Sequence, residues 1–207
     1  MEKNILLSTA YLPPIDFFIS IGGSNLSLLD KTEKYQKQTY RNRTCIYAPN
    51  GVQSLIIPIL RPYNIPIKDV KIEYQTPWQR NHWRSITAAY NNSPFFEYYQ
   101  DLFAPFYNQK ITFLFDYNWE LIQLLNKLLN IPASNVILSN DKESDLHFSN
   151  ITSLISPKKP SVYTYKPYYQ VFNDRYGFIP NLSIIDLLFN IGPKSKEYLD
   201  QNYKNNE

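Results

Sequence analysis

The sequence predicts a single mixed α/β domain over residues 1–207. Its first thirty residues read as strand, loop, helix and strand, an order typical of a βαβ unit. A turn signal at Ala48–Gly51 separates two runs of β-forming residues and predicts a hairpin. Apolar residues then recur at helical spacing in several segments, which indicates helices packed on a sheet. A chain of 207 residues is below the length of roughly 250 at which chains usually split into domains.

The βαβ unit is predicted from the first apolar runs of the chain. Ile5–Thr9 is interpreted as a buried strand that ends before two prolines. Ile15–Ile21 follows as a short helix, because Pro is tolerated in a first turn and Gly22-Gly23 can end it. Leu26–Leu29 is the second strand. No G-x-G-x-x-G loop occurs here, so classical dinucleotide binding is not expected.

The hairpin is predicted around Pro49-Asn50-Gly51, because Pro sets φ at the second turn position and Asn and Gly tolerate positive φ after it. Tyr40–Tyr47 before the turn is rich in β-formers, and Val52–Ile59 after it is almost continuously apolar. Side chains alternate between the two faces of a strand. Arg41 and Arg43 are therefore expected on one face, with Tyr40 and Asn42 on the other.

Two arginines on one strand face would stand about 7 Å apart and repel each other unless an anion lay between them. Guanidinium forks match phosphate or carboxylate oxygens in pairs, so one interpretation is an anion site. The other is that each arginine pairs with an acidic residue, for which Asp30 and Glu33 stand just ahead of the strand. The spacing leaves both open.

A helix with a histidine in its apolar stripe is predicted after Thr76-Pro77, with Thr as cap and Pro in the first turn. At 100° per residue one face carries Trp78, His82, Ile86, Ala89 and Tyr90. A histidine on such a face is either a hydrogen-bonded core residue or, if the face lines a cleft, a general acid or base.

The remaining elements are predicted by similar signals. Val70–Tyr74 and Tyr168–Phe172 alternate like strands, and Phe95–Tyr107 is a helix bent or broken at Pro105. Asp116 is expected to cap a helix that ends at Leu129. Ala133–Val162 is a polar surface segment, in which His147 receives no role. Ser183 begins the last helix with Asp186 as its capping partner, Gly192-Pro193 closes it, and residues 200–207 are expected to fray.

Composition excludes several classes of function. A net charge of +3 is too small for a dedicated nucleic-acid binder. One cysteine, Cys45, excludes an internal disulfide and fits a reducing cytoplasm. Two histidines argue against a structural zinc site, and no metal or cofactor is expected. No signal peptide core and no window of about eighteen apolar residues occurs, so we expect a cytoplasmic protein without a membrane span.

The ordered motifs along the chain resemble those of the WbqC-like family of bacterial proteins, in the branch common in Bacteroidetes. The motifs are Tyr11-Leu12-Pro13-Pro14, KQTYRNR (37–43), PNGVQ with IPI (49–59), TPWQRNHWRSI with AAYNNSPFFEYY (76–99), LISPKKP (154–160), YYQVF (168–172) and FIPNLSIIDLLFNIG (178–192). The resemblance places Arg41, Asn42, Arg43, His82, Tyr90, Gln170 and Asp186 in family motifs.

What the resemblance implies is a role in surface-polysaccharide or O-antigen biosynthesis, with transfer of an acyl or aminoacyl group onto a nucleotide-activated amino sugar. In this hypothesis Arg41 and Arg43 hold phosphate, and His82 accepts a proton. The sugar is oriented by Tyr11, Tyr40 and Asn42, with Gln170 as a further binding residue. The alternative is a non-catalytic binding or assembly protein of a polysaccharide locus. The sequence leaves the donor, the acceptor and the oligomeric state open.

Overall fold

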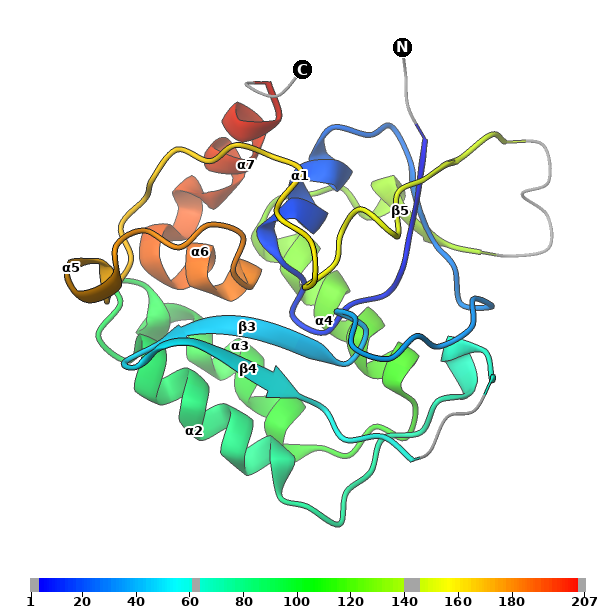
Figure 1. The fold of residues 1–207 in the computed structure, drawn as a ribbon, viewed down its shortest axis with the longest axis horizontal. Helices are drawn as coiled ribbons and strands as arrows, with labels where there is room; N and C mark the ends of the chain where they lie inside the picture. Colours follow the sequence, from blue (N-terminus) through cyan, green and yellow to red (C-terminus); the bar gives the residue numbers. More distant parts are fainter. Residues whose placement is uncertain (1–3, 61–63, 140–145, 205–207) are drawn as a thin grey trace.

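The computed structural model describes residues 4–60, 64–139 and 146–204 (Figure 1). The mixed α/β class is confirmed: a parallel four-stranded sheet and a separate antiparallel hairpin are surrounded by helices. In these three described ranges no helix combines the length and the apolar character needed to cross a membrane.

The parallel sheet has the strand order β5-β2-β1-β6. Along the chain, β1, β2 and β5 are added in one direction across the sheet, whereas β6 lies on the opposite side of β1. The order therefore reverses between β1 and β6. The strands are β1 (Ile5–Leu7), β2 (Ser27–Leu29), β5 (Val136–Leu138) and β6 (Ser149–Asn150).

The predicted βαβ unit is confirmed. Helix α1 (Ile15–Gly22) joins β1 to β2, and these strands pair in parallel with Ile5 opposite Ser27. Residues 15–21 of α1 are all buried, because α7 and α6 pack against the helix. The helix is thus a central element of the core rather than a surface layer.

The hairpin consists of β3 (Arg43–Ala48) and β4 (Gly51–Ile56), and the turn falls where it was predicted. Gly51 has a φ of 97°, a conformation that favours glycine. In Figure 1 the hairpin lies between α2 and α6, and Ser183 N–H at the start of α6 donates to the Cys45 carbonyl on β3.

The first strand of the hairpin begins later than expected, at Arg43 rather than Tyr40. The carbonyls just before it accept bonds from outside the hairpin: that of Tyr40 from Tyr11 N–H at 2.8 Å and that of Arg41 from Asn118 Nδ2 at 2.7 Å. Arg41 is therefore not a strand residue. The expectation that both arginines share one strand face is wrong.

The helices follow the predicted order, although several boundaries differ. Pro105 lies inside α3 without ending it, and α7 continues to Lys204, while 205–207 are outside the described residues. The α-helices are α2 (Trp78–Tyr90), α3 (Phe96–Asn108), α4 (Leu114–Leu128), α5 (Asn173–Tyr176), α6 (Ile184–Ile191) and α7 (Ser195–Lys204); the 3₁₀ turns are η1 (Ile67–Asp69), η2 (Ala133–Asn135) and η3 (Gly192–Lys194).

The three predicted side-chain caps are wrong. Helix α2 begins after Pro77, which itself occupies the cap position, so Thr76 is one residue too early. Asp116 lies within the first turn of α4, because that helix begins at Leu114. Ser183 does occupy the cap position of α6, but its hydroxyl donates to the Leu12 carbonyl at 3.0 Å instead of capping the helix.

Three segment predictions also need correction. Val70–Tyr74 forms only isolated bridges at Lys71 and Ile72 rather than a strand. Tyr168–Phe172 is not a strand, because the Tyr168 and Gln170 side chains turn inward to Asp186. The polar segment Ala133–Val162 supplies both outer strands of the sheet, β5 and β6; its residues 140–145 are outside the described residues.

Candidate functional site

A small crevice opens where the strand order of the sheet reverses. It is lined by Ser8 and Thr9, which follow β1, by Thr152, which follows β6, and by Tyr40 and Arg41. Its volume is about 20 Å³, enough for about one water molecule or one polar group. The carboxyl ends of strands at such a reversal are the usual ligand position in open parallel sheets.

Arg41 in this crevice is held by Glu33. Its Nε donates to Glu33 Oε1 at 2.9 Å and its Nη2 to Glu33 Oε2, while Nη2 also donates to Ser8 Oγ at 2.7 Å. The two side chains are 5% and 14% exposed, so the pair is largely buried. Burial raises the pKa of Glu33, and Arg41 opposes that shift. The ion-pair alternative from the sequence is thus confirmed for Arg41 and Glu33.

Thr9 contributes a polar group without a partner. The residue is 1% exposed, and its hydroxyl makes no hydrogen bond with any of the described residues. A buried hydroxyl left unpaired costs about 1–3 kcal/mol. Its place on the crevice wall makes it a candidate group for a ligand.

Arg43 lies on β3 and is half-buried. Within the described ranges it forms no ion pair, and its buried Nε has no hydrogen-bond partner. The positive charges of Arg43 and Arg41 both lower the pKa of Tyr35, against the larger effect of burial, which raises it. The two arginines therefore lie around the same tyrosine, although they do not share a strand face.

Asn42 has a structural contact. Its side-chain Nδ2 donates to the Ile57 carbonyl at 2.8 Å, and its backbone carbonyl accepts from Ile57 N–H at 2.8 Å. The side chain is 6% exposed. These two bonds fix the open end of the hairpin directly beside Arg41.

His82 lies in the core next to Tyr11. The Tyr11 hydroxyl is 3.0 Å from His82 Nδ1 and 3.0 Å from the Tyr107 hydroxyl. Burial lowers the pKa of His82 to about 4, and a hydrogen bond with the Ile56 backbone acts in the opposite direction. A hydrogen bond raises the pKa of His82 when the imidazole donates it, so its acceptor is the Ile56 carbonyl. The other ring nitrogen, Nδ1, then accepts from the Tyr11 hydroxyl. His82 is thus neutral at pH 7.

The buried face of α2 is the predicted one: Trp78, His82, Ile86, Ala89 and Tyr90 are all buried. His82 does not line the crevice at β1 and β6. His82 is linked to the crevice through Tyr11, which follows the crevice residue Ala10 in the chain and is itself fully buried.

Gln170 belongs to a second cluster, centred on Asp186. This carboxylate is fully buried and accepts bonds from the Tyr90 hydroxyl at 3.0 Å, from Gln170 Nε2 at 2.9 Å and from the Tyr168 hydroxyl. The pKa of Asp186 is raised to about 6, because the effect of burial exceeds that of its three hydrogen-bond donors, which act to lower it. Asp186 is therefore the hub of a buried network and not a cap.

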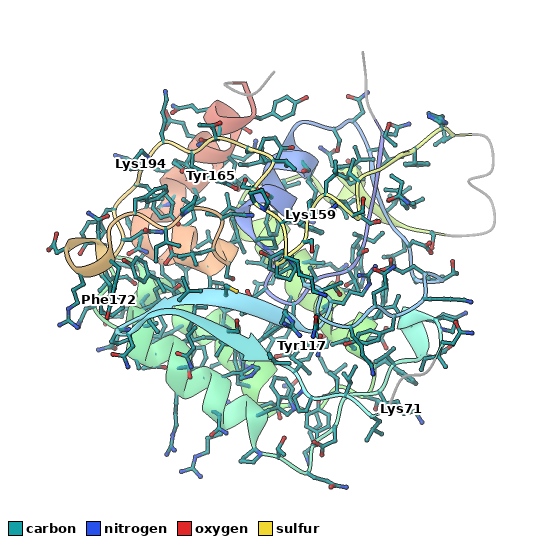
Figure 2. The ribbon with its side chains drawn as sticks, in the orientation of Figure 1. Lys71, Tyr117, Lys159, Tyr165, Phe172 and Lys194 are labelled. Atoms are coloured by element: carbon teal, nitrogen blue, oxygen red, sulfur yellow. The ribbon has the colours of Figure 1, made fainter. Side chains whose placement is uncertain are left out.

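A similar carboxylate, which the sequence analysis missed, lies at the start of α1. Asp16 is 1% exposed and accepts bonds from Ser161 Oγ at 2.6 Å, from Asn181 Nδ2 at 2.8 Å and from the Tyr165 hydroxyl. Tyr165, labelled in Figure 2, lies on the segment that runs beside α1. The available signal was an acidic residue inside the apolar run Ile15–Ile21, a pattern shared with Asp186.

The predicted residues thus fall into separate groups. Tyr40 and Arg41 line the crevice, with Asn42 and Arg43 next to it in the chain. Tyr11 and His82 form a buried pair, and Gln170 joins Asp186. Among the described residues no three His, Cys, Asp or Glu side chains gather as a set that could hold a metal ion.

Comparisons with known proteins agree with the motifs. The sequence pattern of the WbqC-like protein family matches residues 9–158 and 156–198. The chain is similar to the uncharacterized protein Rv1507c of Mycobacterium tuberculosis, with 24% identity over 234 residues, which covers 96% of this chain and 98% of that protein. No solved structure matches it significantly.

Proposed function

Because this chain belongs to the WbqC-like protein family, we propose that it acts in bacterial surface-polysaccharide biosynthesis, including that of O-antigen, on a nucleotide-activated amino sugar. The activity proposed is transfer of an acyl or aminoacyl group to the sugar amine. The proposal also includes a cytoplasmic location, which the single thiol of Cys45 fits.

The observation that carries the proposal is the crevice at the carboxyl ends of β1 and β6. It is lined by Ser8, Thr9 and Thr152 beside a guanidinium, at the position where open parallel sheets bind ligands. Its volume of about 20 Å³ is too small for a whole sugar. It therefore suits one oxygen-bearing group that anchors a ligand lying across the surface.

The charges divide the binding roles. The charge of Arg41 is balanced by Glu33, so Arg41 and Ser8 serve as oriented hydrogen-bonding groups. Arg43 has no ion-pair partner among the described residues and supplies the positive charge for phosphate. Tyr40 lines the crevice and orients the anchored sugar, Tyr11 N–H and Asn42 Nδ2 fix the neighbouring backbone, and Gln170 orders the neighbouring segment through Asp186.

In the transfer step, the amine nitrogen of the sugar bonds to the carbonyl carbon of an activated acyl or aminoacyl donor, and the bond from that carbon to its leaving group breaks. The amine proton passes to a base and then to the leaving group. We assign the base to His82, acting through the Tyr11 hydroxyl that contacts its Nδ1. The imidazole is neutral at pH 7 and can therefore accept a proton, although burial, which lowers its pKa to about 4, makes it a weak base.

The second candidate is a non-catalytic binding or assembly protein of a polysaccharide locus. The observation that favours it is the burial of His82, which is 6% exposed and bonded to Tyr11 and to the Ile56 backbone. In this candidate His82 only supports the core, and the crevice binds without turnover.

A thermal-shift screen with UDP-glucosamine, UDP-glucose, UDP and acetyl-CoA tests the binding site. A ligand at about 100 times its Kd stabilises by about 2.7 kcal/mol, and each kcal/mol shifts Tm by roughly 2–4 °C at this size. Thr9→Val and Arg43→Gln remove the unpaired hydroxyl and the unpaired charge. Arg84→Gln, at an exposed position on α2, is the matched control.

The outcomes separate the two candidates. A UDP-glucosamine shift that disappears in Thr9→Val and Arg43→Gln, but not in Arg84→Gln, establishes the crevice as the site. An amide product from UDP-glucosamine and acetyl-CoA, detected by mass spectrometry and lost in His82→Gln at a temperature where this variant still shows the UDP-glucosamine shift, then supports the transferase. Binding without product from acyl or aminoacyl donors selects the non-catalytic candidate. The absence of any shift with these sugars overturns the proposed function.

A further inference from the structure

A second cavity, much larger than the crevice, lies between α4 and the turn that leads into β5. Its volume is about 290 Å³, near the lower end of roughly 300 Å³ for small-molecule pockets. One wall is the face of α4 that carries Trp119, Gln123 and Lys127, three residues spaced four apart. Ile131 and Val136 form an aliphatic part of the lining. The size suits one ring with substituents.

Trp119 has an indole face without an aromatic partner. Of the three tryptophans, Trp78 packs on the rings of Tyr74, His82 and Tyr117, and Trp83 packs on those of Phe96 and Tyr107. Trp119 makes no ring contact with any aromatic side chain in the part of the chain that the structure describes. A half-buried indole on a cavity wall therefore keeps a flat apolar surface for a ligand.

Asn126 gives the second, independent observation. The residue is 5% exposed and lines the cavity, and its Oδ1 has no hydrogen-bond partner among the described residues. A buried amide is normally paired, so an unpaired one requires an explanation. This oxygen is itself buried, so the amide must turn toward the cavity for a ligand hydroxyl to satisfy it.

Lys127 supplies the charge of the cavity. It is exposed, it forms no ion pair within the described ranges, and it is the one charged residue among the described residues that line the cavity. With no carboxylate in that lining, the cavity favours an anion. An ammonium is a donor only, so it matches a carboxylate or phosphate oxygen.

From these features we propose that the α4 cavity binds an anionic monosaccharide, with the pyranose ring on Trp119, hydroxyls on Asn126 and Gln123, and the carboxylate or phosphate on Lys127. A saturated ring offers C–H groups to the indole and to Ile131 and Val136, whereas a nucleobase would be better served by a second aromatic wall. The cavity shares no lining residue with the crevice, so this inference does not depend on the proposed function.

The test is a titration of the ¹⁵N-labelled full-length protein, followed by NMR. Trp119→Phe assigns the Trp119 indole N–H signal. The probes are glucuronate and glucose 1-phosphate, which distinguish a carboxylate from a phosphate, with glucose as neutral sugar and uridine as base-containing control. We expect both anionic sugars to move the Trp119 indole and Asn126 amide signals, and glucose to bind about tenfold more weakly, the effect of one charge-assisted bond.

Variants make the result specific. Lys127→Gln, at an exposed position, should remove the tenfold preference for the anionic sugars and leave glucose unchanged, whereas Arg84→Gln on α2 should change nothing. Asn126→Leu should weaken the binding of all three sugars. The amide spectrum of this variant should remain that of a folded protein. The inference is overturned if millimolar sugars leave the Trp119 signal in place, if Lys127→Gln keeps the preference, or if uridine binds as well as the sugars.

Discussion

The Tyr11 hydroxyl lies 3.0 Å from His82 Nδ1, across 71 positions of sequence. This contact joins the segment after the first strand to the middle of α2, and Tyr11 extends it by a second bond to Tyr107 on α3. Three elements are thus tied together by two hydroxyls and one imidazole. The stability of the fold should therefore depend on His82, whatever its chemical role.

His82→Gln should lower the free energy of unfolding by about 1–3 kcal/mol, because it leaves the buried Tyr11 hydroxyl without its acceptor. At roughly 2–4 °C per kcal/mol the fall in Tm is easily measured by calorimetry. Tyr11→Phe should show a similar fall, and the double variant should fall by less than the sum because the residues are in contact. Strict additivity would contradict the contact.

The pH dependence of stability should contain two opposed contributions. Asp186 has a folded pKa of about 6 against a usual value of 3.8, so its contribution is full below pH 4 and is lost as pH rises through 6. His82 has a folded pKa of about 4 against 6.5, so its contribution is full above pH 6.5 and is lost as pH falls through 4. Burial also raises the pKa of Asp16 and of Glu33, so these two groups, like Asp186, contribute stability that is lost as pH rises.

Urea unfolding between pH 4 and 6.5 separates these contributions. Relative to the wild type, His82→Gln should lose more stability on going from pH 4 to 6.5, because only the buried carboxylates then remain. Asp186→Asn should gain more stability over the same range. Profiles of both variants that run parallel to the wild type would show that neither group titrates in this window.

The Arg41–Glu33 pair should reveal the cost of an unpaired buried charge. The Arg41 side chain is only 5% exposed. Glu33→Gln leaves this buried guanidinium without its carboxylate and should destabilise the fold by about 3 kcal/mol. Arg41→Met together with Glu33→Leu removes both charges and should be much closer to the wild type. Chemical unfolding of the single and double variants is the measurement. A double variant less stable than Glu33→Gln alone would contradict this reasoning.

Gly192 should tolerate a methyl group much less well than Gly177. Both have a positive φ, 55° and 71°, so alanine strains the backbone at each by about 1–3 kcal/mol. A Cβ at Gly192 would also lie 2.5 Å from the Phe95 ring, whereas nothing lies within 4 Å at Gly177. Gly192→Ala should therefore lose a further 1–3 kcal/mol or so. Equal Tm values for the two variants would rule out the close contact.

Local sequence signals predicted the parts of the fold that depend on local physics. The turn at Pro49-Asn50 and the buried face of α2 both follow from patterns within a few residues. The outer strands β5 and β6 have only three and two residues, too few for alternation to show, and they exist because β2 and β1 lie beside them.

The site was less predictable for the same reason. Spacing placed Arg41 and Arg43 on one strand face, but distant partners, Tyr11 and Asn118, bind the backbone before β3 and keep Arg41 out of the strand. Asp186 read as a local cap because its partners Tyr90 and Tyr168 are remote in sequence. The β1–β6 crevice exists only once the strand order is known.

The backbone bridge between Pro14 and Ser183 has a consequence for folding while the chain is being synthesised. The Ser183 hydroxyl donates to the Leu12 carbonyl, 171 residues earlier, and Ile15 N–H donates to the Leu182 carbonyl. Contacts so distant in sequence are slow to form. The apolar helix α1 leaves the ribosome early and must wait for nearly the whole chain, a period during which truncated products would expose it to aggregation or chaperone capture.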